Sequence, residues 1–336
     1  MISVIVPIFN EEKYIEKCVQ SIVNQDYPHD DMEVVFADGM STDRTRDILA
    51  DLAQQYPFMR VVDNPQRTVS YALNAGIRAA KGDIIIRLDA HAIFPQNYFS
   101  VLVQHLETLS ADNVGGVCRT LPADESPLCR AIAAVLSHPF GMGNSYFRIG
   151  TSEIREVDTV PFGCFRRSIF DKVGFFDEEL IRNQDDEFNA RIIKNGGKIY
   201  LIPQLVIDYF ARRTVRGLAS MFYQYGLFKP LVNKKLGKPA TVRQFFPLLF
   251  VLGILFGSVL SFFCYPIAYA FSAVMALYLL ISMVLSLRTA VKENCPEIFF
   301  NMFWLFFIVH FCYGFGYLHG MCKILLHRKF NVKSRR

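Results

Sequence analysis

Polar side chains follow three apolar segments in the first ninety residues, at the points where the segments end. They are Asn10 and Glu11 after residues 2–8, Asp38 after residues 33–37, and Asp89 and His91 after residues 83–88. If the segments are parallel strands, their carboxyl ends meet at one edge of a sheet, where such sheets bind ligands. The sequence therefore predicts a polar ligand site at that edge.

The strongest of these groups is Asp89-Ala90-His91. A carboxylate and an imidazole two positions apart at a strand end can both reach one ion, and these donors suit Mn²⁺ better than Ca²⁺. A metal there would stabilise the negative charge of a departing diphosphate. The alternative is that the group only begins the helix expected beyond Pro95, and the short D-x-H pattern leaves both interpretations open.

The turn after the second apolar segment contains two further acids, Asp38 and Asp43. A carboxylate at the end of a buried strand can accept hydrogen bonds from a ribose or a base, and we favour this interpretation for Asp38. For Asp43 we favour a capping role at the helix that begins near Thr45, because a side-chain oxygen there accepts from free backbone N–H groups of the first turn.

A third acidic group, Asp185-Asp186-Glu187, opens a predicted helix that stops near Gly196-Gly197. The helix dipole favours acids in the first turn, so ordinary helix signals explain part of this pattern. Three consecutive acids exceed what those signals require. One of them could be a general base that removes a proton from an acceptor hydroxyl.

A small-residue turn, Gly163-Cys164, follows the predicted strand that begins at Val157. Small residues there would allow a substrate to approach the backbone closely. A single cysteine in an apolar stretch is more often a packing residue than a nucleophile, so we interpret Cys164 as packing.

The elements that must position these residues alternate along the first 110 residues. Apolar runs at 2–8, 33–37, 59–63 and 83–88 are separated by helical patterns at 11–24, 43–56 and 68–80. Strands that alternate with helices predict an α/β fold with a parallel sheet covered on both faces.

Composition separates the 336-residue chain into two unlike halves. Residues 1–209 have a net charge of −9 and residues 210–336 a net charge of +14, while 52% of all residues are hydrophobic. The mean hydropathy of +0.23 excludes a disordered chain. Because the basic half is also the apolar half, its charge indicates an anionic membrane surface and no nucleic acid. Eight cysteines without a C-x-x-C pattern indicate reduced thiols in the cytosol.

Long uncharged runs predict a membrane region at residues 244–322, followed by a basic tail at 323–336. The 44 residues between Arg243 and Arg288 are all uncharged. Since one span needs about 20 apolar residues, we expect helices at 245–265 and 266–287, and a third at 298–318. Basic flanks favour the cytoplasm for both residues 234–243 and the tail, which three spans cannot satisfy. Either the tail is an exception to the positive-inside rule, or one of the three apolar runs does not cross the membrane.

Residues 211–243 are predicted to form an amphipathic interfacial helix and a linker. The pattern places six apolar side chains on one helical face: Val215, Leu218, Met221, Phe222, Tyr225 and Phe228. With flanking arginines this is typical of a helix in the headgroup plane of a membrane. A helix that faces a protein core is the alternative.

Together these motifs resemble family 2 glycosyltransferases of the GT-A fold, and within them the membrane-attached bacterial exopolysaccharide type, similar to succinoglycan glucosyltransferase. The resemblance covers about residues 1–230. Its segments are VIVPIFNEEKYIEKCVQSI, ADGMSTDRT, ALNAGIRAAKGDIIIRLDAHA and FGCFRRSIFDKVGFFDE with NQDDEFNARIIKNGG. It implies a Rossmann-like GT-A catalytic domain at 1–210 that binds a nucleotide sugar, before the interfacial helix and the C-terminal transmembrane helices.

The resemblance also implies site residues and a cofactor. The donor would be a UDP-sugar, the cofactor Mn²⁺ or Mg²⁺, and the reaction an inverting direct displacement. Asp89 matches the first acid of the family's D-x-D motif, with His91 in place of the second, so both are expected at the metal. Asp185 matches the family's base and Asp186 is the reserve. The residues expected to border the nucleotide sugar are Pro7, Asn10, Glu11, Asp38, Asn74 and Asp89.

The sequence thus predicts a multi-pass enzyme of the bacterial inner membrane with a cytoplasmic catalytic domain. The Q-x-x-R-W motif of processive synthases is missing, so we expect transfer of a single sugar to a lipid-linked (polyprenyl-diphosphate) glycan in exopolysaccharide or surface polysaccharide synthesis. Other polysaccharide-assembly proteins are expected as partners. The alternatives are transfer to polyprenyl phosphate, which needs no general base, and a non-catalytic nucleotide-sugar-binding scaffold.

Overall fold

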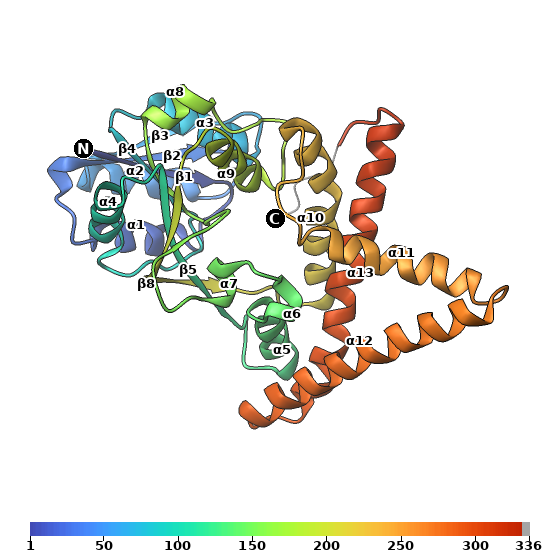
Figure 1. Ribbon diagram of the computed structural model, residues 1–336. Coiled ribbons are helices and arrows are strands. Elements are labelled where there is room, and N and C mark those ends of the chain that lie inside the picture. The colour runs from blue at the N-terminus through green and yellow to red at the C-terminus, as the bar shows by residue number, and fades with distance from the viewer. Residues whose placement is uncertain (331–336) are drawn as a thin grey trace. The chain divides into compact units, whose positions relative to one another are not determined.

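The computed structural model describes residues 1–330, so the predicted basic tail is described only as far as Phe330. The chain forms two compact units. Unit 1 comprises Met1–Arg119 and Gly150–Tyr209, and unit 2 comprises Thr120–Ile149 and the described residues from Phe210 onward. The predicted catalytic residues all belong to unit 1, and the long apolar helices all belong to unit 2 (Figure 1).

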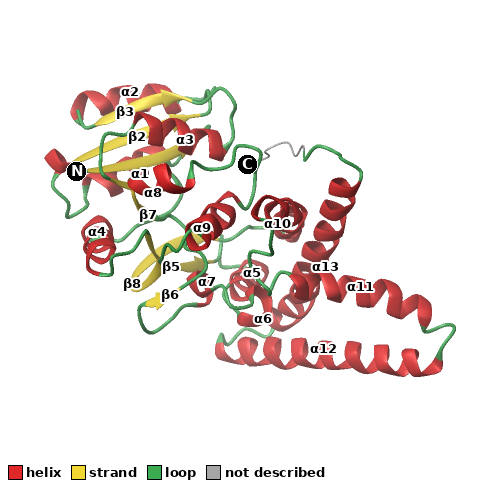
Figure 2. Cartoon of the chain, turned by 45° about the horizontal axis from the view of Figure 1, so that its top comes forward, coloured by secondary structure: helices red, strands yellow, loops and turns green. Residues whose placement is uncertain are grey.

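Four parallel strands form the first half of the sheet of unit 1, in the order β3-β2-β1-β4. They are β1 (Ile2–Ile8), β2 (Met32–Asp38), β3 (Met59–Asp63) and β4 (Ile84–Arg87). Every residue of β1 and β2 is buried, as continuous apolar runs predict for parallel strands covered on both faces. The helices between them are α1 (Ile15–Val23), α2 (Thr45–Gln55) and α3 (Val69–Ala79), which flank the strands in Figure 2. The strand and helix predictions for this region are confirmed.

The second half of the sheet, beyond the first 110 residues from which the parallel strands were predicted, is mixed. The order continues β4-β7-β5-β8-β6, with β5 (Asn113–Leu121), β6 (Arg155–Glu156), β7 (Cys164–Arg166) and β8 (Ile199–Phe210). β7 pairs antiparallel with both β4 and β5. A parallel neighbour needs a crossover connection, usually a helix. β7 is instead reached through the irregular segment 157–163, and therefore can run in the opposite direction.

Three more helices complete unit 1: α4 (Tyr98–Thr108), α8 (Ser168–Val173) and α9 (Gln184–Lys194). α9 is tied to β5 and to the segment before β7 through buried amides. Asn113 Nδ2 donates to Asn189 Oδ1 at 2.8 Å, and Asn189 Nδ2 donates to the Thr159 hydroxyl at 2.8 Å. These hydrogen bonds fix the position of the helix that begins with the three consecutive acids.

Unit 2 is helical. Its helices are α5 (Pro127–Leu136), α6 (Pro139–Met142), α7 (Tyr146–Ile149), α10 (Val215–Leu236), α11 (Phe245–Leu260), α12 (Tyr265–Lys292) and α13 (Glu297–Leu325). Its core joins α5, α10 and α13, with fully buried side chains such as Leu136, Leu218 and Phe306.

α10 begins where the interfacial helix was predicted, but its apolar face has a protein partner. Leu218, Met221 and Phe222 are buried in the core shared with α5 and α13. The prediction that this face lies on lipid is therefore corrected in favour of the alternative, a core-facing helix. Amphipathic periodicity alone does not distinguish the two, because both require one apolar face.

Helices occupy all three predicted membrane segments. Of these, α12 with 28 residues and α13 with 29 residues are long and apolar enough to cross a membrane, whereas α11 has only 16 residues. At 1.5 Å per residue α11 is about 24 Å long, less than the roughly 30 Å of a hydrocarbon core.

Close packing of α10 on α13 depends on glycines. A Cβ atom at Gly226 of α10 would collide with the carbonyl oxygen of Tyr313, and one at Gly316 of α13 would collide with the carbonyl oxygen of Tyr223. Gly316 and Gly320 form a small-x-x-x-small pattern that allows two helix backbones to approach closely.

Replacing Gly226 by alanine is expected to destabilise unit 2 by about 1–3 kcal/mol, because the added methyl group forces two packed backbones apart. Thermal unfolding of the detergent-solubilised protein measures the effect. The matched control is Gly253→Ala in α11, where an added Cβ would meet no atom within 4 Å. Equal melting temperatures for the two variants would contradict this account of the packing.

Candidate active site

The loops that follow β1 and β2 are joined by hydrogen bonds. The backbone N–H of Asn10 donates to Ser41 Oγ at 2.9 Å, and Asn10 Oδ1 accepts from the N–H of Thr42 at 2.8 Å. Pro7 lies buried in β1 opposite Ala37 of β2. The structure thus brings the first two predicted strand ends together at one edge of the sheet.

Asp38 is fully buried at the end of β2. Its carboxylate accepts hydrogen bonds from the Ser41 hydroxyl at 2.5 Å and the Ser41 N–H at 3.1 Å, and forms an ion pair with Arg46 Nε at 2.8 Å. These contacts shape the turn after β2. Asp43 accepts from the N–H and the hydroxyl of Thr45, the first residue of α2, although the N-cap position itself is Arg44.

The ends of β1 and β4 meet through Glu11 and His91. Glu11 is buried, and its Oε1 lies 3.8 Å from Nδ1 of His91, whose side chain is 41% exposed. The helix after this turn, α4, has its N-cap at Asn97. Asp89 and His91 therefore lie well before the helix start, which removes the capping alternative for this pair.

Arg87 connects the two predicted catalytic regions. This last residue of β4 is buried, and its guanidinium forms an ion pair with Asp185 through Nη1 and lies 3.4 Å from Asp89 Oδ1 through Nη2. The guanidinium carbon lies 5.9 Å from the centre of the Phe162 ring. Asp89 and Asp185 are far apart in sequence, and this shared arginine places both carboxylates around one point.

Asp185 is held by the start of α9. It is the second residue of the helix, after the left-handed N-cap Asn183. Two residues later Glu187 forms an ion pair with Arg191 at 2.6 Å, and Arg191 Nη2 donates to the carbonyl of Phe175 at 2.7 Å. The Glu187 and Arg191 side chains, which match the family pattern, thus fix α9 to the preceding loop and orient Asp185.

Burial raises the pKa of the Asp185 carboxyl above its ordinary value. The Arg87 guanidinium opposes this rise, while the nearby Asp89 and Asp186 carboxylates add to it. The Asp185 side chain is still 32% exposed, so a substrate hydroxyl can reach it. A carboxylate with a raised pKa is a stronger proton acceptor, which suits a general base.

The raised pKa predicts an acid limb in the pH dependence of kcat. The base is active when ionised, so activity should fall as the pH drops through the pKa of Asp185, at a higher pH than for an ordinary aspartate. A pH–rate profile of kcat measures this limb, and donor binding measured over the same range is the control. A profile that stays flat down to the ordinary aspartate pKa would contradict the assignment.

Asp89 and His91 can supply at most part of a metal site. Within the described residues, no three His, Cys, Asp or Glu side chains are placed so that they could hold a metal ion together. Mg²⁺ and similar ions are commonly held by one or two carboxylates together with substrate phosphates and water. In such an arrangement Asp89 would supply the carboxylate and His91 an imidazole nitrogen, and a nucleotide diphosphate would complete the coordination.

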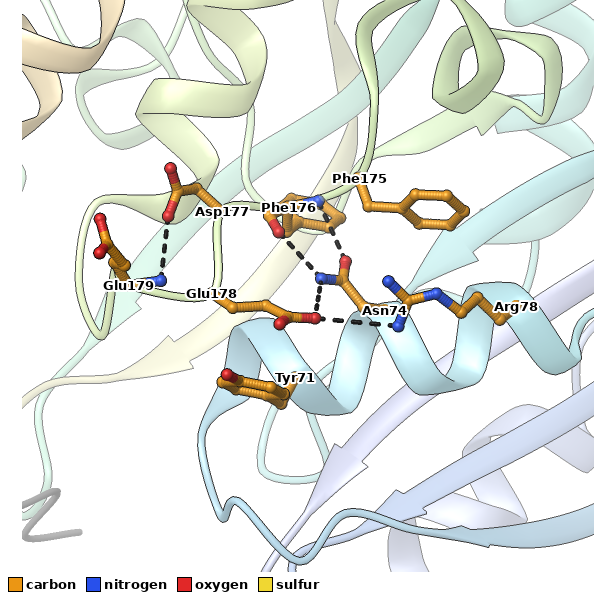
Figure 3. A pocket seen from close by; sticks show the side chains of 8 residues that line it. All are labelled: Tyr71, Asn74, Arg78, Phe175, Phe176, Asp177, Glu178 and Glu179. Atoms are coloured by element: carbon orange, nitrogen blue, oxygen red, sulfur yellow. Dashed lines mark hydrogen bonds and ion pairs between the residues drawn. The ribbon is translucent and has the colours of Figure 1, made fainter.

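Asn74 makes a different set of contacts from the other predicted site residues. Its amide accepts from the N–H of Phe176 at 3.0 Å and donates to the carbonyl of Phe176 and to Glu178, both at 2.9 Å. Figure 3 shows this amide pointing from α3 toward the loop 175–179. Asn74 thereby anchors the loop at an open pocket of about 440 Å³, whose lining residues do not include Arg87, Asp89 or Asp185.

Gly163 and Cys164 have structural roles, which corrects the expectation that they admit a substrate. A Cβ atom at Gly163 would collide with Asn113 Oδ1 and with the ring of Phe165, so the small residue serves packing inside the unit. Cys164 is fully buried in β7, and burial raises the pKa of its thiol. The packing interpretation of this cysteine is consistent with both observations.

Arg87 is the one of these paired residues that the sequence patterns did not single out. It ends the apolar run IIIR in a strand buried by its neighbours. A buried arginine requires an anionic partner, because an unpaired charge in the interior is very costly. The charge at the end of this otherwise apolar strand could therefore have indicated, from the sequence alone, that Arg87 pairs with an acidic side chain.

The fold of the chain is that of GT-A glycosyltransferases. A solved structure of similar fold is the mannosyltransferase PcManGT from Pyrobaculum calidifontis in complex with GDP-Man and Mn²⁺, with a TM-score of 0.54 and 20% identity over 92% of this chain and 85% of that one. Another is S. aureus TarS 1–349 in complex with UDP, with a TM-score of 0.51 and 16% identity over 90% and 89% of the two chains.

The chain belongs to glycosyl transferase family 2, whose sequence profile matches residues 3–174. A relative from Methanococcus voltae is 29% identical over 96% of this chain and 97% of its own length. Its name is dolichyl N-acetyl-alpha-D-glucosaminyl phosphate 3-beta-D-2,3-diacetamido-2,3-dideoxy-beta-D-glucuronosyltransferase. The succinoglycan biosynthesis protein ExoA of Rhizobium meliloti (strain 1021) is 30% identical, over 77% of each chain. The predicted family and enzyme class are confirmed.

Proposed function

We propose that this glycosyltransferase moves a single sugar from a UDP-sugar to a hydroxyl of a lipid-linked glycan, with inversion at the anomeric carbon. The observation that favours this reaction is the pairing of Arg87 with both Asp89 and Asp185, which places a proton acceptor beside the carboxylate expected at the donor diphosphate. The fold likeness to a UDP complex and the dolichyl-linked acceptor named for the M. voltae relative support the choice of donor and acceptor.

In the proposed reaction Asp185 accepts the proton of the acceptor hydroxyl. The hydroxyl oxygen then bonds to the anomeric carbon while the bond from that carbon to the diphosphate breaks, and UDP leaves with the bonding electrons. Mn²⁺ or Mg²⁺ bound by Asp89 and His91 would neutralise charge on the leaving diphosphate. Arg87 pairs with both carboxylates and favours the ionised form of Asp185.

The location that fits this reaction is the cytoplasmic face of a bacterial inner membrane, within exopolysaccharide or surface polysaccharide synthesis. Nucleotide sugars and reduced thiols are both cytoplasmic, and all eight cysteines in the described residues are free. Polysaccharide-assembly proteins remain the proposed partners.

A transfer assay with separated donors and acceptors tests the proposal. Membranes containing the protein are incubated with Mn²⁺, labelled UDP-glucose, UDP-galactose or UDP-N-acetylglucosamine, and either polyprenyl phosphate or a polyprenyl-diphosphate-linked glycan. We expect label in the lipid fraction from one donor and only with the glycan acceptor. Label on polyprenyl phosphate itself would favour the reaction that needs no base, and binding of UDP without any transfer would contradict the proposal.

A further inference from the structure

The outer part of the α11–α12 pair in unit 2 has no protein partner within the described residues. The two helices are antiparallel: the rings of Phe250 and Tyr278 are 4.5 Å apart, and a Cβ atom at Gly257 would touch the ring of Phe271. From residue 252 to residue 277 no side chain is buried, and none is charged. An exposed apolar surface of this length is not stable in water, so this hairpin requires lipid.

On its α11 side, the part of the hairpin without a protein partner is shorter than a bilayer core. Residues 252–264 form an arm about 20 Å long, against a hydrocarbon core of roughly 30 Å. The turn between the helices is itself apolar, with Phe262 87% and Phe263 83% exposed. No residue between 252 and 277 is charged, so the turn offers no charged side chain to the opposite headgroups.

α13 is apolar enough to cross, but it is tied at both ends to helices that are not. Near its start, Ile298 and Met302 of α13 share a buried core with α5. Just before that start, Arg130 of α5 donates to the carbonyl of Glu293, the C-cap of α12, at 3.0 Å and to its carboxylate at 2.9 Å. Farther along, α10 runs beside α13 in the same direction, because Tyr223 approaches Gly316 and Leu227 approaches Gly320.

A crossing of α13 would therefore take α10 into the bilayer. α10 includes charged residues at four positions: Arg216, Lys229, Lys234 and Lys235. Charges inside the hydrocarbon core are costly, and α10 lacks the uncharged length of a span. The pairing with α10 thus disfavours a crossing by α13.

We propose that the protein is monotopic: the α11–α12 hairpin enters the bilayer from the cytoplasmic face and turns within it, and α13 remains on that face. The basic residues at both ends of the hairpin, including Lys238, Arg243 and Arg288, then lie at anionic headgroups on one side. Lys323, in the last turn of α13, and Arg328, after the helix, lie on the same side. This topology satisfies the positive-inside rule at every basic flank, which three spans cannot do.

Cysteine labelling tests the topology in the full-length protein. Five cysteines are buried, so the background needs only Cys264→Ser, Cys312→Ala and Cys322→Ser. Single cysteines are placed at four exposed positions: Val242, Phe262, Val291 and Leu326. Spheroplasts and inverted vesicles are treated with a membrane-impermeant maleimide, and a detergent-treated sample gives full labelling.

We expect Val242→Cys, Val291→Cys and Leu326→Cys to react only in inverted vesicles, and Phe262→Cys to react from neither side until detergent is added. Labelling of Phe262→Cys in spheroplasts would show that the hairpin crosses. Labelling of Val291→Cys and Leu326→Cys from opposite sides would show that α13 crosses. Either result overturns the proposal.

A charge at the turn gives an independent measurement. In Phe262→Asp a carboxylate must enter the hydrocarbon core, so the fraction released by alkaline extraction should rise by more than about tenfold. The matched control is Val242→Asp, which introduces the same charge at an exposed position before α11. Equal release of the two variants would contradict a turn inside the bilayer. Sugar transfer is not read in either experiment, so their outcome is independent of the proposed reaction.

Discussion

Replacing Asp185 by asparagine is expected to lower kcat by about 10²–10⁴-fold, the usual contribution of a general base. The amide keeps the shape of the carboxylate but does not accept the acceptor proton, and it leaves the buried Arg87 with a weaker partner. Donor binding should change much less, because Asp185 is assigned to the acceptor side. Initial rates over a range of donor and acceptor concentrations separate the two effects.

Asp186→Asn is the matched control, since it removes the same charge from the next position of α9. We expect this variant to retain most of its activity and to keep the acid limb of the pH profile, which Asp185→Asn should lose. The opposite result would make Asp186 the base. Full activity in both variants would indicate a reaction that needs no base, as for a phosphate acceptor.

Replacing Arg87 by methionine is expected to reduce both stability and activity. The change leaves the Asp89 and Asp185 carboxylates without the cation that they share. Removal of one partner from a buried ion pair costs about 3 kcal/mol or somewhat more. Both carboxylates keep some contact with water, at 20% and 32% exposure of their side chains, so the lower end of that range applies.

The pH profile distinguishes this effect from simple unfolding. Arg87 lowers the pKa of Asp185, so its loss should raise that pKa further. Because the ionised base is the active form, the acid limb of kcat should move to higher pH. Arg87→Lys keeps the positive charge but cannot reach both carboxylates with separate nitrogen atoms. The acid limb of its kcat profile should lie between those of the wild type and Arg87→Met. A limb at the same pH in all three proteins would rule out the proposed role of Arg87.

The local pattern of the sequence determined the parallel half of the sheet and its ligand edge. Strands β1 to β4 and helices α1 to α3 lie where the apolar runs and helical patterns predicted them. Residues next to a strand end, such as Asn10, Asp38 and Asp89, could be assigned to one edge because strand direction follows from the connecting helices. Short motifs, whose residues are close together in the sequence, were also sufficient to identify the family.

Contacts between distant residues were decided only by the tertiary structure. The ion pair of Arg87 with Asp185 joins residues 98 positions apart, and the antiparallel placement of β7 depends on its neighbours β4 and β5. The partner of the apolar face of α10 is α13, about ninety residues later in the chain. An apolar face must be covered, but its periodicity does not specify whether lipid or another helix covers it, because both remove the same surface from water.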